Sequence, residues 1–134
     1  MNKMNTTVKK EEEKHIVACY GTLMEGYGNH GCLGKTPKML GAGKTDEKML
    51  MTASGIPFVS KSKPVSQIHV EVYEVDDDVL YRLDCLEGHP RFYERQITDI
   101  TLENGEKTKA WMYFCDRGSN RVIETGNYKD YRKS

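Results

Sequence analysis

The sequence predicts an α+β domain in which β-strands form most of the core and one short helix packs beside them. Three observations indicate this class. Apolar and polar residues alternate over 67–73, as in a half-buried strand. Asn104-Gly105 lies between two β-prone runs, the pattern of a hairpin turn. Apolar residues recur at helical spacing over 79–86, which predicts one amphipathic helix.

The length and charge of the chain indicate the number of domains and the kind of ligand. With 134 residues, the chain fits one domain, which we place over 15–134. Residues 1–14 are polar and charged, and we expect a flexible leader there. Twenty basic and twenty acidic side chains cancel, so a small-molecule ligand is favoured over nucleic acid or a membrane surface. The sequence shows neither a membrane span nor an apolar signal core, which predicts a cytoplasmic protein.

The first predicted strand runs over Ile16–Tyr20, five apolar or aromatic residues in a row. Gly21 ends it, because a residue without a side chain lets the backbone turn and a ligand approach its N–H groups. The strand is therefore expected to end in a binding loop, Tyr20-Gly21-Thr22-Leu23. Taken alone, these four residues are more typical of an ordinary buried strand followed by a turn.

A glycine-rich segment over 24–34 follows and is expected to be a loop that forms one wall of a pocket. Gly41-Ala42-Gly43 is predicted to form a bend, and Glu47–Ala53 is predicted as the next strand. Over 54–59, glycine and proline are expected to break regular pairing, although Ile56, Phe58 and Val59 can still enter the core.

The strand over Gln67–Tyr73 is expected to bury Ile68, Val70 and Val72 and to expose the residues between them. A helix then begins at Asp76-Asp77-Asp78 and ends at Gly88. Its apolar face comprises Val79, Leu80, Leu83 and Leu86. Strands over Glu94–Leu102 and Lys107–Phe114 form the hairpin, and the tail over 116–134 offers little to bury beyond Tyr128 and Tyr131.

Glu87 is the candidate catalytic residue because it is the last residue of the predicted helix. The partial negative charge of the helix end disfavours a carboxylate there, so the pKa of Glu87 is expected to be raised, as a general base and acid requires. The alternative is a solvated glutamate at a helix end, a common feature without function.

Other sites are not indicated. His30 and Cys32 lack paired ligands at defined spacing, so no metal site is predicted. The glycines of 26–34 lack the Walker spacing of a phosphate loop. Four separated cysteines are expected to be reduced thiols, two of them in the core: Cys19, Cys32, Cys85 and Cys115.

Several motifs together resemble the gamma-glutamylcyclotransferase-like family, most closely its branch that acts on gamma-glutamylamines. Their order and separation span residues 16 to 131. The strongest is Leu83-Asp84-Cys85-Leu86-Glu87-Gly88. The others are Val17–Leu23, Gly26, Asn29-His30, Gly55-Ile56-Pro57, Pro90, Tyr93, Arg95, Ala110-Trp111, Tyr113 and Gly126-Asn127-Tyr128.

This resemblance implies a small mixed β-barrel with short peripheral helices and a pocket at one end. It implies that the loop holds the glutamyl group and that Glu87 is the catalytic base. The implied substrate-binding residues are Tyr20, Gly21, Thr22, Leu23 and, to close the pocket, Tyr128. A core or rim position for Tyr128 is an equal alternative.

The implied reaction converts a gamma-glutamyl amine or gamma-glutamyl amino acid to 5-oxoproline and a free amine, with no cofactor. One alternative is a non-catalytic relative that binds or sequesters a small metabolite in the same pocket. A weaker one is an interaction module whose hairpin over 94–114 offers an edge to a partner.

Overall fold

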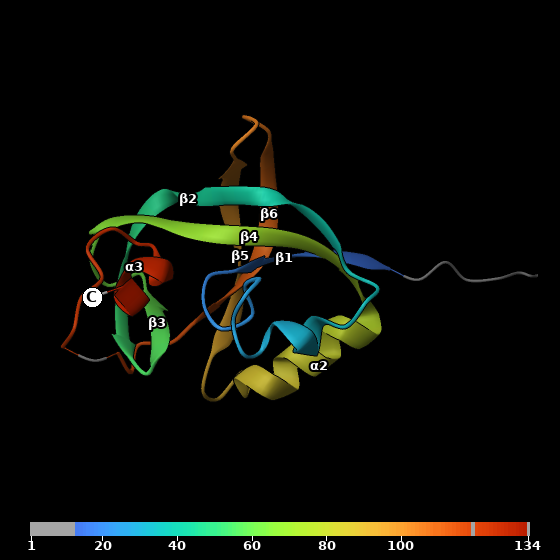
Figure 1. Ribbon diagram of the computed structural model, residues 1–134, viewed down its shortest axis with the longest axis horizontal. Helices are drawn as coiled ribbons and strands as arrows, with labels where there is room; N and C mark the ends of the chain where they lie inside the picture. Colours follow the sequence, from blue (N-terminus) through green and yellow to red (C-terminus); the bar gives the residue numbers. More distant parts are fainter. Residues whose placement is uncertain (1–12, 119, 134) are drawn as a thin grey trace, which may run out of the picture.

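The protein is a mixed β-barrel with one helix packed against it (Figure 1). This computed structural model describes residues 13–118 and 120–133. Around the barrel the strands follow the order β2 (Lys38–Ser54), β4 (Ser66–Asp76), β1 (Lys14–Cys19), β6 (Lys107–Phe114) and β5 (Glu94–Leu102). Pairing of β5 with β2 closes the barrel, and β1 with β6 is the parallel pair among these antiparallel strands. The predicted α+β class and the implied barrel are both confirmed.

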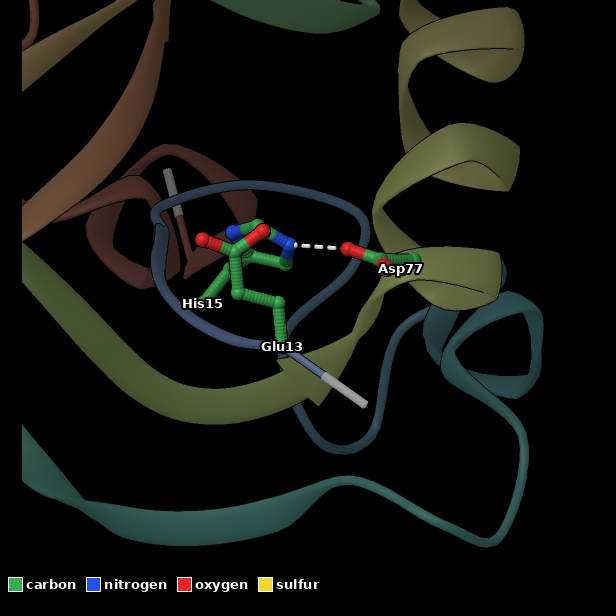
Figure 2. A group of neighbouring side chains, drawn as sticks. All are labelled: Glu13, His15 and Asp77. Atoms are coloured by element: carbon green, nitrogen blue, oxygen red, sulfur yellow. Dashed lines mark hydrogen bonds and ion pairs between the residues drawn. The ribbon is translucent and has the colours of Figure 1, made fainter. Parts of the chain in front are cut away.

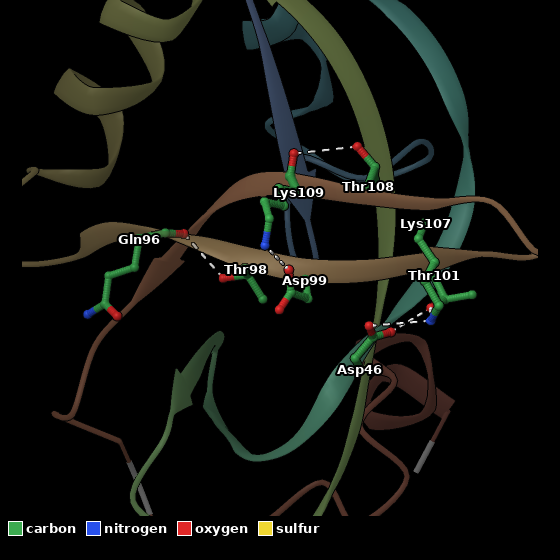
Figure 3. A network of polar contacts seen from close by, with 8 residues as sticks. All are labelled: Asp46, Gln96, Thr98, Asp99, Thr101, Lys107, Thr108 and Lys109. Carbon is green, nitrogen blue, oxygen red and sulfur yellow. Dashed lines mark hydrogen bonds and ion pairs between the residues drawn. The ribbon is translucent and has the colours of Figure 1, made fainter.

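The hairpin of β5 and β6 has the predicted bounds, and Gly105 in its turn has a positive φ of 94°. Its exposed face carries polar contacts (Figure 3). Lys109 Nζ lies 2.6 Å from Asp99 Oδ1, which joins the two hairpin strands. Thr101 Oγ1 donates to Asp46 Oδ1 at 2.5 Å, and this bond crosses the closing seam between β5 and β2.

Strand β2 is far longer than the predicted Glu47–Ala53. The glycines at 41 and 43, which suggest a bend, instead allow the strand to continue past β5. A Cβ at Gly43 would lie 2.6 Å from the carbonyl oxygen of Thr101, so only glycine permits this approach. Register shifts between Met39 and Gly41 and between Lys44 and Lys48 bend the strand, which pairs with β4, β5 and β3.

The expected break in pairing over 54–59 is wrong. β3 (Ile56–Ser60) pairs antiparallel with the end of β2 through a tight turn at Gly55, whose φ is 81°. Phe58 and Val59 are buried as predicted, whereas Ile56 is 40% exposed. β3 lies outside the closed ring of five strands, so Pro57 interrupts no barrel ladder.

The helix α2 (Asp77–Glu87) begins and ends as predicted. The Asp76 side chain accepts a hydrogen bond from the Val79 N–H at 2.9 Å, and Gly88 adopts the left-handed conformation after the last turn. Three of the four apolar positions are buried, but Leu86 is 43% exposed and does not join the core face.

Strand β4 is buried on both faces in its centre, which the alternating pattern did not predict. Glu71, expected outside, is only 6% exposed, and the neighbouring Tyr73 is 5% exposed. The Glu71 carboxylate accepts hydrogen bonds from the Glu25 N–H at 2.8 Å and from the Tyr73 hydroxyl at 3.1 Å. The 24–34 segment, with η1 (His30–Leu33), and the C-terminal segment, with α3 (Tyr128–Lys133), cover this face.

The C-terminal segment also packs more than its composition suggests. Ile123 is buried, and its N–H donates to the carbonyl oxygen of Met51 in β2. Two cysteines are in the core, as predicted: Cys19 and Cys115. The other two, Cys32 and Cys85, are exposed. The predicted leader lies outside the described residues except for its last two, and Lys14 already belongs to β1.

Candidate active site

A cavity of ≈ 170 Å³ opens where β1 ends, between the start of β3 and the end of α2. The predicted loop and the predicted catalytic residue meet in it. Its lining comprises Ala18, Cys19, Tyr20, Gly21, Thr22, Leu23, Asn29, Ile56, Pro57, Leu86, Glu87, Phe92, Tyr93 and Tyr113. The fold therefore brings residues 20–23 and Glu87 together across a long separation in sequence.

The loop presents hydrogen-bond donors to this cavity. In the part of the chain that the structure describes, the N–H groups of Gly21, Thr22 and Leu23 find no acceptor. Thr22 Oγ1 accepts a bond from Asn29 Nδ2 at 2.9 Å, which leaves its own proton available to a ligand. Consecutive N–H groups of this kind can hold a carboxylate or a developing oxyanion.

Gly21 is required for a second reason that the sequence did not reveal. A Cβ at this position would overlap the Pro57 ring of β3. The loop therefore lies directly against β3, and the close approach fixes one wall of the cavity.

Glu87 is half-buried, and burial raises its pKa to about 7. The direction agrees with the prediction, and the cause is desolvation of the carboxylate. No donor to its carboxylate is found among the described residues. A carboxylate without a fixed partner is free to exchange a proton with a ligand.

The other ionisable groups of the lining are neutral near pH 7. Burial raises the pKa of the Cys19 thiol and of the Tyr20, Tyr93 and Tyr113 hydroxyls. The tyrosine hydroxyl protons are also engaged: Tyr20 donates to the Tyr113 carbonyl and Tyr93 to the Pro57 carbonyl, both at 2.7 Å. Glu87 is thus the group of the lining suited to move a proton at neutral pH.

A network that the sequence did not indicate anchors the helix that carries Glu87. Arg95 of β5 donates from Nε and Nη2 to the two oxygens of Asp84, at 2.8 and 3.1 Å. The Tyr113 hydroxyl donates to the same carboxylate at 2.7 Å. Because Tyr113 also accepts the bond from Tyr20, the network joins α2 to both the barrel and the loop.

Tyr128 does not line the cavity. Its hydroxyl donates to the Gly55 carbonyl at 2.9 Å, and its ring lies 5.5 Å from that of Tyr27. It therefore supports the turn that leads into Ile56 and Pro57. A direct role for Tyr128 in substrate binding stays a prediction.

A separate polar group lies at the other end of α2 (Figure 2). His15 Nε2 lies 2.5 Å from Asp77 Oδ1, and Glu13 is close enough that one ligand atom from each of the three residues falls within 4.8 Å. These three could share a cation. Helix α2 separates them from Glu87 by about 15 Å along its axis.

His30, which lies in the 24–34 segment, contacts the Leu23 carbonyl oxygen at 2.9 Å through Nδ1.

A small mixed β-barrel with a cavity at the end of β1 is the fold that the resemblance to gamma-glutamylcyclotransferase-like proteins implied. The family model for "Gamma-glutamyl cyclotransferase, AIG2-like" matches residues 17–130, and the chain belongs to this family. No helix in the described residues is long and apolar enough to cross a membrane.

Similar proteins agree with this assignment. A protein of Methanocaldococcus jannaschii named "Putative gamma-glutamylcyclotransferase" is 45% identical over 116 residues, which cover 87% of this chain and 97% of that protein. A Drosophila melanogaster protein with the same description is 39% identical over 116 residues, and the match covers 80% of this chain and 73% of that protein. The crystal structure of a mouse AIG2-like protein shares the fold, with a TM-score of 0.75, 23% identity, and coverage of 86% and 88%. Membership of this family supports the conclusion that the protein is an enzyme.

Proposed function

We propose that this protein is a cyclotransferase that converts a gamma-glutamyl amine or gamma-glutamyl amino acid to 5-oxoproline and a free amine. The observation that carries the proposal is the arrangement of the cavity. Glu87, with a pKa of about 7, shares one small space with the N–H groups of residues 21–23, and neither finds a hydrogen-bond partner within residues 13–118 and 120–133. Four free cysteines support a cytoplasmic setting, where thiols stay reduced.

The loop is assigned to substrate binding. Its N–H groups and the Thr22 hydroxyl can donate to the alpha-carboxylate of the glutamyl group and to the gamma-carbonyl oxygen. Donors aimed at the oxygen that gains charge lower the barrier because they require no rearrangement during the reaction. Tyr20 contributes its ring, since its hydroxyl is already bonded to the Tyr113 carbonyl.

The reaction joins two ends of one molecule. The substrate's alpha-amine nitrogen forms a bond to its gamma-carbon, and the bond from that carbon to the leaving nitrogen breaks. Two of the three alpha-ammonium protons end on the departing amine, which leaves as an ammonium, and the third remains on the lactam nitrogen. Nucleophile and electrophile are already linked, so folding the substrate in the cavity supplies much of the rate and no cofactor is required.

Glu87 is assigned as the group that carries these protons. With a pKa of about 7 it is ionised in a large fraction of molecules at neutral pH, yet it is basic enough to take a proton from the ammonium. It then returns the proton to the leaving nitrogen. The remaining ionisable groups of the lining hold their protons too tightly for this task.

The test is release of 5-oxoproline from L-gamma-glutamyl amino acids, gamma-glutamyl-epsilon-lysine, gamma-glutamyl alkylamides and glutathione. Glu87→Gln should abolish turnover, with a loss of about 10²-fold or more in kcat, while the protein stays folded. Glu47→Gln makes the same change at an exposed glutamate of β2 and should leave turnover unchanged.

Failure of the folded wild-type protein to turn over any of these compounds would contradict the proposal. If it instead retained one of them unchanged, the protein would be a binder that sequesters a metabolite. Isothermal titration with each compound distinguishes this outcome from an empty pocket.

A further inference from the structure

Glu71 of β4 carries a buried carboxylate that lies outside the cavity lining formed by the described residues. Burying a carboxylate is unfavourable unless donors surround it. Here the Glu25 N–H donates at 2.8 Å and the Tyr73 hydroxyl at 3.1 Å, both to Oε1. Lys129 Nζ of α3 lies 3.8 Å from Oε2. One carboxylate thus joins β4, the C-terminal helix and the residue that follows the binding loop closely in the chain.

The binding loop begins beside Glu71. Cys19, the last residue of β1, is directly opposite Glu71 in the pairing of β1 with β4, and such pairs share one face of the sheet. Burial, and then the charges of Glu87 and Glu71, raise the pKa of the Cys19 thiol, so both carboxylates lie near this thiol. Cys19 lines the cavity, and Tyr20 follows it. The loop therefore leaves β1 at the level of Glu71.

The chain beyond the loop is bonded to the same carboxylate. Glu25 is exposed, yet its N–H donates to Glu71 Oε1. Residues 20–24 therefore span two points that are both fixed to one position of β4. A short span that is held at both ends has few conformations left to it.

The orientation of the loop donors depends on this span. The Gly21 carbonyl accepts a bond from the Met24 N–H at 3.0 Å, and the Thr22 carbonyl accepts one from the Asn29 N–H at 2.9 Å. In a trans peptide group the N–H points away from the carbonyl of the preceding residue. Holding these two carbonyl groups therefore also directs the N–H groups of the next residues, which find no acceptor among the described residues.

We propose that Glu71 is a positioning residue: its carboxylate fixes the far end of the binding loop and thereby keeps the N–H groups of residues 21–23 directed at the substrate. This inference rests on the proposed cyclotransferase function, in which those groups hold the glutamyl part of the substrate. Glu71 acts through the loop, whereas Asp84 acts through the helix that carries Glu87.

The hydrogen bond can be removed without changing Glu71. The Tyr27 N–H donates to the Met24 carbonyl at 3.1 Å, and Gly26 has a φ of 91°, the pattern of a type II turn with Glu25 at its second position. Proline is favoured at that position, so Glu25→Pro suits the turn and removes the N–H. Glu25→Ala is the matched control, because it removes the same exposed side chain and keeps the N–H.

The experiment measures 5-oxoproline release by the full chain from L-gamma-glutamylglycine, L-gamma-glutamyl-n-butylamide, gamma-glutamyl-epsilon-lysine and glutathione. For each compound that the wild-type protein turns over, Glu25→Pro should lower kcat/KM by about tenfold. Most of this loss should be a higher KM, because the displaced N–H groups also hold the alpha-carboxylate of the bound substrate. Glu25→Ala should stay within about twofold of the wild-type protein.

Two variants at Glu71 test the same bond from its other side. Glu71→Gln keeps an oxygen that can accept the Glu25 N–H and should retain KM within about threefold. Glu71→Leu has no acceptor and should show the higher KM of Glu25→Pro. In Glu25→Pro the acid limb of kcat/KM should stay near pH 7, because Glu87 keeps its burial.

The outcomes separate the positioning role from the proposed function. If the folded wild-type protein releases 5-oxoproline from none of the four compounds, the proposed function fails and the positioning role fails with it. If turnover occurs but Glu25→Pro keeps the wild-type KM, or Glu25→Ala raises KM as much, the positioning role is overturned and the cyclotransferase stands. An acid limb in Glu25→Pro that moves toward pH 4.5 would indicate general damage to the site and would also overturn it.

Discussion

Asp84 and Glu87 lie one turn apart on α2, yet their pKa values shift in opposite directions. Burial acts on both carboxyl groups. At Asp84 the hydrogen bonds from Arg95 and Tyr113 outweigh burial and lower the pKa. At Glu87 no such donor is present among the described residues, and burial raises the pKa to about 7. The same helix thus carries one carboxyl group whose ionised form is stabilised by its donors and one whose pKa of about 7 lies near neutral pH.

The pH dependence of turnover follows from Glu87. As a base it must be ionised, so kcat/KM should fall as pH drops through about 7, by about tenfold for each further pH unit. Initial rates of 5-oxoproline release from pH 5 to 8 measure this limb. An acid limb near pH 4.5, the ordinary value for glutamate, would show that Glu87 is not the titrating base.

The free energy of unfolding should fall as pH rises over the range in which turnover rises. The folded state holds the Glu87 proton more tightly than the unfolded chain, whose pKa is near 4.5. Stability is therefore lost as pH rises from about 4.5 to about 7. Glu87→Gln removes the unfavourable free energy of burying the ionised carboxylate. It should therefore raise the melting temperature at pH 8 by about 3 °C, with little change at pH 4.5. Calorimetry at the two pH values checks it, and an equal shift at both would contradict it.

Asp84 is expected to act as a positioning residue. Asp84→Ala leaves Arg95 and the Tyr113 hydroxyl without their acceptor and should cost about 2 kcal/mol of stability. It should also lower kcat by about tenfold at nearly constant KM, because Glu87 loses its fixed orientation. Urea denaturation and steady-state kinetics measure the two effects.

The matched control for Asp84→Ala is Asp99→Ala. This change breaks the exposed pair between Asp99 and Lys109, which lie on the hairpin of β5 and β6 (Figure 3). Exposed pairs contribute little, so both the free energy of unfolding and kcat should stay close to the wild-type values. Equal kinetic losses in the two variants would indicate a general structural effect. Asp84→Asn keeps an acceptor for Tyr113 and should recover part of the lost kcat.

The contact between Gly21 and Pro57 gives a test of the loop. Gly21→Ala should destabilise the protein by about 1–3 kcal/mol and raise KM, because the new methyl group meets the Pro57 ring. Pro57→Ala in the same chain should relieve part of this cost, with a coupling energy of about 1 kcal/mol. Strictly additive effects in a double-mutant cycle would show that the two residues do not conflict.

The sequence was informative wherever a local pattern decides local structure. The caps of α2 at Asp76 and Gly88 and the Asn104-Gly105 hairpin depend on neighbouring residues alone, and both were predicted correctly. The barrel and the pairing of the loop with Glu87 came from the family resemblance. No periodicity could have supplied them.

What the sequence could not reveal depends on contacts between distant segments. Glu71 looked solvent-facing because alternation cannot show that other parts of the chain cover the outer face of β4. The Arg95 bond to Asp84 joins a strand to a helix, and although both residues belong to the motifs of the resemblance, no local pattern shows that their side chains meet. The glycines at 41 and 43 were misread as a bend because their partner strand lies far along the chain.

Closure of the barrel sets when the pocket can form. Gly43 of β2 pairs with Leu102 of β5, about sixty residues later, and such long-range pairing is slow because loop-closure entropy is lost before the contacts stabilise it. Tyr113 and the anchor of α2 come still later in the chain. During synthesis, the loop over residues 20–23 therefore emerges long before Glu87, the proposed catalytic residue, is held in place. The proposed site is complete only when β6 has joined β1.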